Sequence, residues 1–256
     1  SRNLVSVEWE ADTPPGTDVL IQTRTGNELD EVVHYFHKDG TEVTETQYGR
    51  LLSIFKGDTT AEEVPGGDWS SWSQPYDDKT GSVITSPSPR EFMKIRATLL
   101  SDGPDTSATL HAIRLSYSNP VAQLLTAELD PVRVDSLGVM RPFSLFVKPS
   151  FRDSDTGFDQ LLLVASPEMS LEFDAVFAGS EAQVAAADPG SIRSATVVGN
   201  TGDSLHIALG VPVLPDTGRE IVRLDFRTSL FSAGMQLRAA ARTSQDPWQW
   251  VNPGDA

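Results

Sequence analysis

The chain contains no cysteine. That absence excludes disulfides, thiolate metal sites, cysteine nucleophiles and thioether-linked haem. It also lacks any apolar run approaching the length of about 18 residues that a membrane-spanning helix requires. The first residues, Ser1-Arg-Asn-Leu-Val, contain no basic-then-apolar leader, so we expect any signal or anchor to have been removed or to lie outside this sequence.

Basic side chains are scarce: 20 lysines and arginines stand against 36 acidic residues, which gives a net charge of -16. Such a surface repels phosphate backbones, and the sequence has no basic stripe, so we expect no nucleic-acid partner. Anionic membrane surfaces are disfavoured for the same reason. Basic or neutral proteins and sugars remain as partners.

Helical periodicity over three turns is also absent, which disfavours α/β folds. One short helix is expected over residues 47–56. Strand-like alternation or strand composition covers residues 4–10, 18–25, 31–37, 42–46, 92–99, 109–117, 124–134, 143–151, 160–165, 171–177, 194–198, 204–209, 220–227 and 235–241. Asp39-Gly40 predicts a hairpin between 31–37 and 42–46, and 92–99 is expected to pair with 109–117 across the polar loop 101–106.

Turn-forming residues recur about every 8 to 12 positions in the second half, including Ser166-Pro167, Asp188-Pro-Gly190 and Leu214-Pro-Asp-Thr-Gly218. This spacing predicts an all-β protein of two antiparallel β-sandwich domains in tandem, of jelly-roll or immunoglobulin-like type. We place the domains at residues 1–122 and 123–256. No linker composition follows Gln123, so the two domains are expected to abut.

Trp69-Ser-Ser-Trp-Ser-Gln-Pro-Tyr76 is the most informative stretch for function. Residues three apart on a regular strand face opposite sides, so we expect one of Trp69 and Trp72 in the core and the other exposed. An exposed Trp72 near Tyr76 would form a platform for a sugar ring or an anchor for a protein partner. The alternative is that both tryptophans fill the end of a sandwich, and large aromatic residues more often do so.

Asp153-Ser-Asp155-Thr-Gly-Phe-Asp159 is the best candidate metal site, because alternating carboxylates around a glycine can hold calcium. The segment departs from an EF-hand loop: its glycine comes one position early, and Val164 stands where the bidentate glutamate belongs. The alternative is a solvated turn in which Asp153 and Asp155 bond the local backbone. Apart from this structural calcium, no cofactor is expected.

Catalytic machinery is not evident. Gly202-Asp-Ser-Leu205 matches a lipase and esterase motif, but no histidine follows His206 to act as its base. His34 and His37 diverge on a strand, and the carboxylate pairs Glu62-Glu63 and Asp77-Asp78 are typical of a solvated acidic surface. We therefore predict that the chain is not an enzyme and rank a hydrolase a distant third among its functions.

The tail Asp246-Pro-Trp-Gln-Trp-Val-Asn-Pro-Gly cannot form a helix. Its alternate tryptophans, Trp248 and Trp250, share one face of an extended chain and group with Arg238 and Arg242. Exposed aromatic tails need cover. We expect these rings either to pack on the second domain or to dock into a neighbouring protein.

Several phrases occur in an order that resembles a module of bacterial exported proteins. They are Ala11-Asp-Thr-Pro-Pro-Gly, Gln22-Thr-Arg-Thr-Gly, Trp69-Ser-Ser-Trp, Ser86-Pro-Ser-Pro-Arg-Glu-Phe-Met and Leu110-His-Ala-Ile-Arg-Leu-Ser-Tyr. Over residues 1 to about 120 the chain resembles a galactose-binding-like, discoidin-like jelly roll. The segment from Tyr35 to Tyr48 resembles inserts of such proteins, and the second half resembles the sandwich domain that often follows. The resemblance implies a fold and an extracytoplasmic bacterial location, periplasmic or at the cell surface, and no activity.

These observations predict a non-catalytic structural or accessory subunit. We expect it to dock on another envelope protein or on the extracytoplasmic face of a membrane complex, with Trp69, Trp72, Tyr76, Trp248 and Trp250 as the candidate binding residues. The alternative is a carbohydrate-binding, lectin-like module that uses Trp69, Trp72 and Tyr76.

Overall fold

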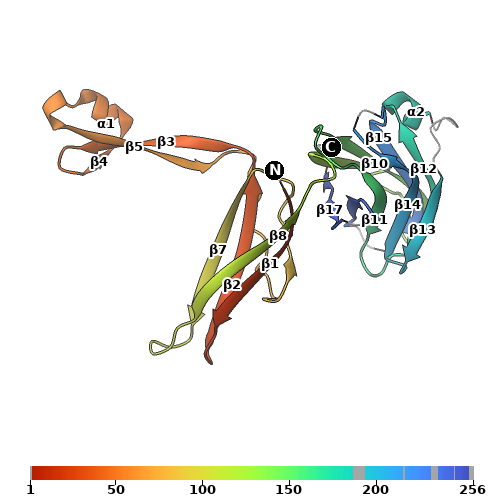
Figure 1. Ribbon diagram of the computed structural model, residues 1–256, viewed down its shortest axis with the longest axis horizontal. Helices are drawn as coiled ribbons and strands as arrows, with labels where there is room; N and C mark the ends of the chain where they lie inside the picture. The colour runs from red at the N-terminus through yellow and green to blue at the C-terminus, as the bar shows by residue number, and fades with distance from the viewer. Residues whose placement is uncertain (1, 187–193, 216, 232–235, 245, 254–256) are drawn as a thin grey trace.

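The structure is a computed structural model that describes residues 2–186, 194–215, 217–231, 236–244 and 246–253. It confirms the all-β prediction. Two sandwiches follow one another along the chain, and a long hairpin projects from the first of them (Figure 1). The elements of the first half are β1 (Asn3–Asp12), β2 (Thr17–Gly26), β3 (Leu29–His37), β4 (Glu42–Val43), α1 (Glu45–Arg50), the 3-10 turn η1 (Ser53–Phe55), β5 (Lys56–Pro65), β6 (Ser82–Val83), β7 (Phe92–Ser101) and β8 (Thr109–Ser118).

The first sandwich packs the sheet β6-β1-β8 against the pair β2-β7. Strand β2 alternates as its sequence predicts, so that its residues Val19, Ile21, Thr23 and Thr25 point inward and are buried. The small core that results consists of Val7, Trp9, Val19, Ile21, Tyr76, Ile84 and Ala108. The predicted pairing of 92–99 with 109–117 is wrong, because β7 pairs with β2 and β8 pairs with β1. The loop between β7 and β8 connects the two sheets.

The projecting hairpin, hereafter the arm, consists of β3, β4, α1, η1 and β5. Its sheet has the order β4-β3-β5, and the described strands of the sandwiches do not join it. The predicted hairpin at Asp39-Gly40 is confirmed, with Tyr35 opposite Val43. The expected helix over 47–56 is shorter and begins earlier, since Thr44 caps α1 through a capping box with Gln47. Strand β5 was not predicted.

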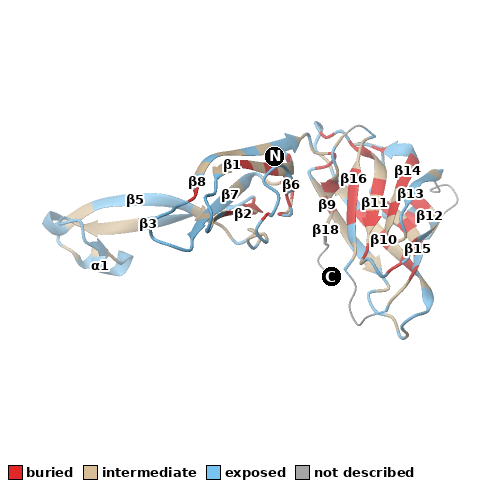
Figure 2. Cartoon of the chain, turned by 90° about the horizontal axis from the view of Figure 1, so that it is seen from below, coloured by how far each residue is buried: buried red, intermediate tan, exposed pale blue. Residues whose placement is uncertain are grey.

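The second sandwich has two five-stranded sheets, β12-β15-β10-β9-β18 and β13-β14-β11-β16-β17. Its elements are β9 (Leu124–Asp130), β10 (Met140–Ser150), β11 (Phe158–Val164), β12 (Glu172–Gly179), α2 (Glu181–Ala185), β13 (Ala195–Asn200), β14 (Ser204–Val213), β15 (Ile221–Ser229), β16 (Arg238–Arg242), β17 (Gln249–Trp250) and β18 (Asn252–Pro253). All eight strands predicted here are found, although Met235 and the turn at Asp188-Pro-Gly190 lie outside the described residues. The inward side chains form one large core between the sheets, visible as the buried positions in Figure 2.

The tail closes this sandwich by pairing with both sheets. Strand β17 continues one sheet beside β16, and β18 runs parallel to β9 in the other. Gln249 is fully buried, and its side-chain amide accepts from Val121 N–H and donates to Ala122 C=O, both at 2.8 Å. Val121 and Ala122 already belong to the second core. The domain boundary after residue 122 stays a prediction.

Candidate functional site

Residues 69–76 lie alongside β2 as an irregular edge of its sheet. Three backbone amides of the segment donate to carbonyls of β2 at 2.8–2.9 Å: Ser70 to Thr25, Ser73 to Thr23 and Tyr76 to Ile21. Three residues of the segment therefore span the same length along the sheet as two residues of β2. A three-residue repeat is the period of a polyproline II-like chain, so side chains three apart point the same way.

Trp69 and Trp72 consequently share the outer side of the sheet. The guanidinium of Arg24 lies 5.4 Å from the ring centroid of Trp69 and 4.8 Å from that of Trp72, and the guanidinium of Arg96 lies 4.4 Å from Trp72. Both rings are partly exposed. The expectation that one of them enters the core is wrong, because it assumed the two-residue repeat of a regular strand.

Tyr76 is the aromatic residue of this segment that fills the core, together with Trp9 of β1. Its side chain is 7% exposed, and its hydroxyl lies 2.6 Å from Thr23 Oγ1. Burial alone would raise the pKa of Tyr76, but hydrogen bonds with Thr23, Ser73 and Thr85 outweigh it and lower the pKa. Tyr76 is therefore not placed to stack on a ligand.

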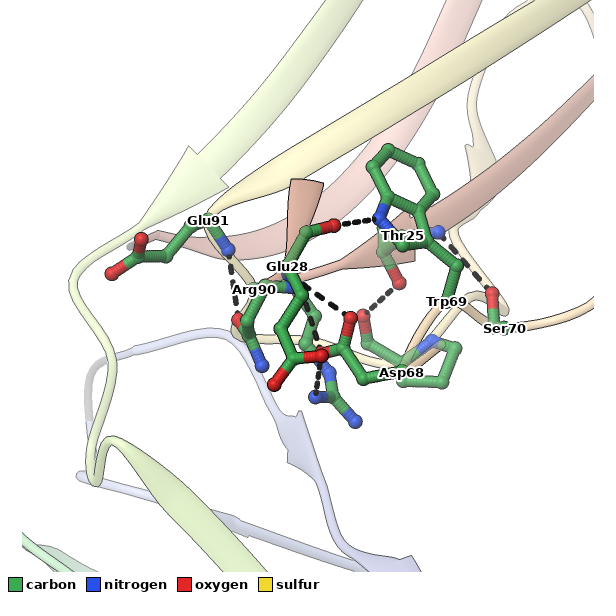
Figure 3. A network of polar contacts seen from close by, with 9 residues as sticks. Thr25, Glu28, Asp68, Trp69, Ser70, Arg90 and Glu91 are labelled. Carbon is green, nitrogen blue, oxygen red and sulfur yellow. Dashed lines mark hydrogen bonds and ion pairs between the residues drawn. The ribbon is translucent and has the colours of Figure 1, made fainter. Parts of the chain in front are cut away.

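The root of the arm is held by a polar network centred on Asp68 (Figure 3). The carboxylate of Asp68 accepts from the backbone N–H groups of Asn27 and Glu28 at 2.8 and 3.0 Å and lies 3.5 Å from Arg90 Nη1. The indole of Trp69 donates to Glu28 C=O at 2.6 Å. Residues 26–28 and 66–68, the two segments that connect the sandwich to the arm, are thereby bound to each other. This fixes the direction of the arm.

The ribbon of the arm is acidic and exposed on both faces. Glu31 of β3 lies directly opposite Glu63 of β5 on one face. On the other face His34 lies between Glu42, at 2.6 Å, and Glu62, at 3.6 Å. The hydrogen bond with Glu42, together with both negative charges, raises the pKa of His34 above its ordinary value.

The tip of the arm is a small knob with an aromatic interior and an apolar exterior. The rings of Tyr35 and Tyr48 lie 5.1 Å apart, and the Tyr48 hydroxyl donates to Gly57 C=O at 2.8 Å. These contacts position residues 52–55, which present three large apolar side chains to solvent: Leu52, Ile54 and Phe55, at 67%, 65% and 44% exposure. An exposed apolar cluster of this kind is typical of a protein-binding surface.

The predicted group at the tail is found, and its members are paired. Arg238 lies 3.9 Å from the ring centroid of Trp250, and Arg242 lies 4.2 Å from that of Trp248. The edge of Trp248 also contacts His206, whose pKa is lowered by burial and by Arg242. These contacts support the expectation that the tail packs on the second sandwich. Binding of a partner at either ring stays a prediction.

Asp153, Asp155 and Asp159 are not arranged as a metal site. Asp155 is buried and accepts from the Arg152 backbone N–H at 2.7 Å, whereas Asp159 accepts from the Ser244 hydroxyl. No group of three potential ligands able to hold a metal exists among the described residues. The backbone bond of Asp155 is the local contact that the turn alternative predicts, although Asp155 itself is buried, and a structural calcium stays a prediction.

The remaining motifs lie in separate places. Gly202-Asp-Ser-Leu205 forms the turn between β13 and β14, where Ser204 Oγ lies 2.6 Å from Thr201 Oγ1. His37 lies 3.3 Å from Asp39 and stacks on Phe55, so it faces a different partner from His34. None of these contacts brings a nucleophile and a base together.

No protein-family profile matches the chain, and no curated protein matches it. Among solved structures it is similar to the T6 backbone pilin of serotype M6 Streptococcus pyogenes, described as a modular three-domain structure decorated with variable loops and extensions. The identity is 13% and the TM-score 0.29, over 98% of this chain and 60% of the pilin. The chain thus spans less than two thirds of the pilin, and a likeness of this size carries no argument about function. Within the described residues no helix is long and apolar enough to cross a membrane.

Proposed function

We propose that the chain is a non-catalytic structural or accessory subunit of an extracytoplasmic bacterial assembly, and that it docks on a protein partner through the arm. The observation that carries this proposal is the knob at the tip, where Leu52, Ile54 and Phe55 are exposed side by side. Exposed apolar clusters of this kind mark protein-interaction sites, and a few buried side chains carry most of the free energy of such a contact.

The architecture of the arm favours docking over a purely structural role in this chain. A two-stranded ribbon is at best marginally stable in water. The arm contributes no residue to either hydrophobic core. Its order comes instead from the Asp68 network at the root and the aromatic contacts of Tyr35 and Tyr48 at the tip. Both places hold the tip in position for a partner, which reduces the entropy lost on binding.

The test compares a tip variant, Leu52→Asp with Ile54→Asp, with the control Leu137→Asp, an exposed leucine of the second sandwich. We expect wild type and control to co-purify with the same envelope protein, and the tip variant to lose it. All three proteins should keep the same thermal midpoint, because neither position belongs to a core. Retention of the partner by the tip variant contradicts the proposal.

The second candidate is a carbohydrate-binding module, and the observation that favours it is the partly exposed Trp72 ring beside Arg24, Arg96 and Gln22. Small-molecule sites combine aromatic side chains with a few polar groups that fix the orientation of the ligand. A sugar would compete with two guanidinium groups for Trp72, so this reading ranks second. Glycan-array binding that disappears in Trp72→Ala at unchanged thermal midpoint would establish it.

A further inference from the structure

Two cross-strand pairs of like charge lie on different parts of the molecule and carry opposite signs. Glu31 faces Glu63 across the arm, and Arg24 faces Lys94 across β2 and β7. Directly opposed side chains in an antiparallel pair have Cβ atoms about 5 Å apart, and like charges at that spacing are destabilising. Among the described residues, none of the four is in an ion pair.

The residues around each pair carry mostly the same charge as the pair itself. Residues 28–63 contain nine carboxylates and three lysines or arginines. The outer side of β2 and β7 shows the reverse: its positions from Leu20 to Gly26 and from Phe92 to Thr98 hold Arg24, Lys94 and Arg96 and no carboxylate. Trp69 and Trp72 lie beside these cations. We call this surface the basic–aromatic face.

We infer that the arm of one copy docks on the basic–aromatic face of a second copy, with Glu31 and Glu63 against Arg24 and Lys94. The inference rests on the proposed function, since it adds a second copy of the chain as a partner of the same arm. Both charged pairs have the spacing of an antiparallel ribbon, so two carboxylates meet two cations in one contact. Val33 and Ala61, the next pair on that side of the arm, then reach the tryptophans.

A contact within one copy does not satisfy these charges. The arm runs away from the strands β2 and β7 at its root (Figure 1), and the Asp68 network holds it in that direction. The face and the arm of one chain thus remain available to two different neighbours.

The net charge of -16 opposes association of copies, but it does not decide the outcome. Charges farther apart than about 8 Å are largely screened at physiological ionic strength. In the proposed contact the four opposed charges lie within that distance of one another, whereas repulsion between distant parts of the two copies is screened. Local complementarity therefore outweighs the average repulsion.

The contact is heterologous, because each copy offers an arm to one neighbour and a face to another. Contacts of this type repeat and give either a closed ring or an open filament. Self-association should therefore give either a closed ring, of which the reciprocal dimer is the smallest, or an open filament.

Sedimentation velocity of the whole chain tests the inference. We expect the average mass to rise with protein concentration between about 1 μM and about 1 mM, the range of weak protein contacts. Added salt should reverse the rise, because ion pairs at a surface are screened. A wild-type chain that stays monomeric throughout this range at physiological ionic strength overturns the inference.

Two variants locate the contact. The arm variant carries Glu31→Lys and Glu63→Lys, and the face variant carries Lys94→Glu, an exposed position remote from the core. Each should associate at least about tenfold more weakly than wild type, while Lys148→Glu, an exposed lysine of β10, should associate as wild type does. An equimolar mixture of the two variants should associate again, because the face variant keeps its arm and the arm variant keeps its face.

Failure of mixing to restore association overturns the head-to-tail contact. That result is distinct from failure of the proposed function, which the tip variant at Leu52 and Ile54 tests by loss of an envelope partner. If the wild-type chain is monomeric but still binds the envelope partner, the proposed function stands. Only the inference that a second copy binds the arm is then wrong. Association that persists in both charge variants likewise contradicts the inference.

Discussion

At the scale of single residues, spacing rather than residue type decides the role of the aromatic segment. Ser70, Ser73 and Tyr76 recur at intervals of three and face β2, which leaves Trp69 and Trp72 on the outside beside Arg24. The repeat Trp-Ser-x-Trp-Ser and the following Pro75 are visible in the sequence. That pattern indicates a three-residue period. The prediction missed it because it assumed the two-residue period of a regular strand.

Gly26 allows Trp69 to lie against the end of β2. A Cβ atom added at Gly26 would come within 2.4 Å of the indole ring, which its hydrogen bond to Glu28 holds in place. We expect Gly26→Ala to lower the free energy of unfolding of the first sandwich by about 1–3 kcal/mol, as overpacking does. Urea denaturation measures the change.

Gly67→Ala is the matched control, because a Cβ atom at Gly67 meets no atom within 4 Å. It should leave stability unchanged or raise it by up to about 1 kcal/mol through the unfolded chain. Equal losses in both variants would show that contact with the Trp69 ring is not the cause.

The two histidines with shifted pKa values should separate in a pH titration followed by NMR. The pKa of His34 is raised above 6.5 by its hydrogen bond with Glu42, and that of His206 is lowered by burial and Arg242. Glu42→Gln should bring the His34 titration down toward 6.5 and leave His206 where it is. A His34 curve that does not move assigns the shift to Glu62 instead.

The sign of the stability effect follows from the direction of the shift. A group whose folded pKa is raised stabilises the fold fully below its unfolded pKa, and loses that contribution as pH rises through the folded value. The arm should therefore be less protected against amide exchange above the His34 titration than below it. Glu42→Gln should weaken this dependence.

At the scale of elements, alternation in the sequence indicated strands such as β2, and β5 is the long strand that it did not indicate. β2 alternates because one face packs on a core, and its sequence shows it. β5 reads Lys-Gly-Asp-Thr-Thr-Ala-Glu-Glu-Val-Pro and is exposed on both faces along most of its length, so no alternation marks it. The predicted pairing of β7 with β8 was wrong for a different reason. Two strands that are close in sequence can form a hairpin or can belong to two different sheets, and the sequence does not distinguish these cases.

Removal of the arm should leave the first sandwich folded. Leu29 pairs with Pro65 at the root, so residues 30–64 can be replaced by an Asn-Gly turn that joins them. Because the arm contributes nothing to the core and contains no tryptophan, the urea midpoint followed by tryptophan fluorescence should stay close to that of the whole chain. Loss of cooperative unfolding would show that the sandwich depends on the arm.

At the scale of the whole molecule, the two hydrophobic cores share no residue. The sequence predicted two sandwiches from the recurrence of turns, but it did not indicate how the second is closed. That closure depends on Gln249, a polar residue between two tryptophans that is fully buried and bonded to Val121 and Ala122. Such a bond links residues far apart in the chain, so no local sequence pattern predicts it.

Because the two cores are separate, a substitution in one sandwich should shift the unfolding transition of that sandwich and not of the other. We expect Gln249→Leu to leave two backbone groups without partners and to destabilise the second sandwich by about 1–3 kcal/mol. Scanning calorimetry should show this shift without a change in the first sandwich, and Gly26→Ala should do the reverse. A single transition that both variants move equally would indicate one cooperative unit.

The root of the arm also has a mechanical consequence. Both strands of the ribbon are continuous with the folded sandwich, at residues 26–28 and 66–68, and Asp68 bonds the two crossings together. A pull on the tip is therefore shared by two covalent chains in parallel, and the hydrogen bonds between β3 and β5 bear little of the load. The arm transmits tension to the sandwich as a tether would, without unzipping first.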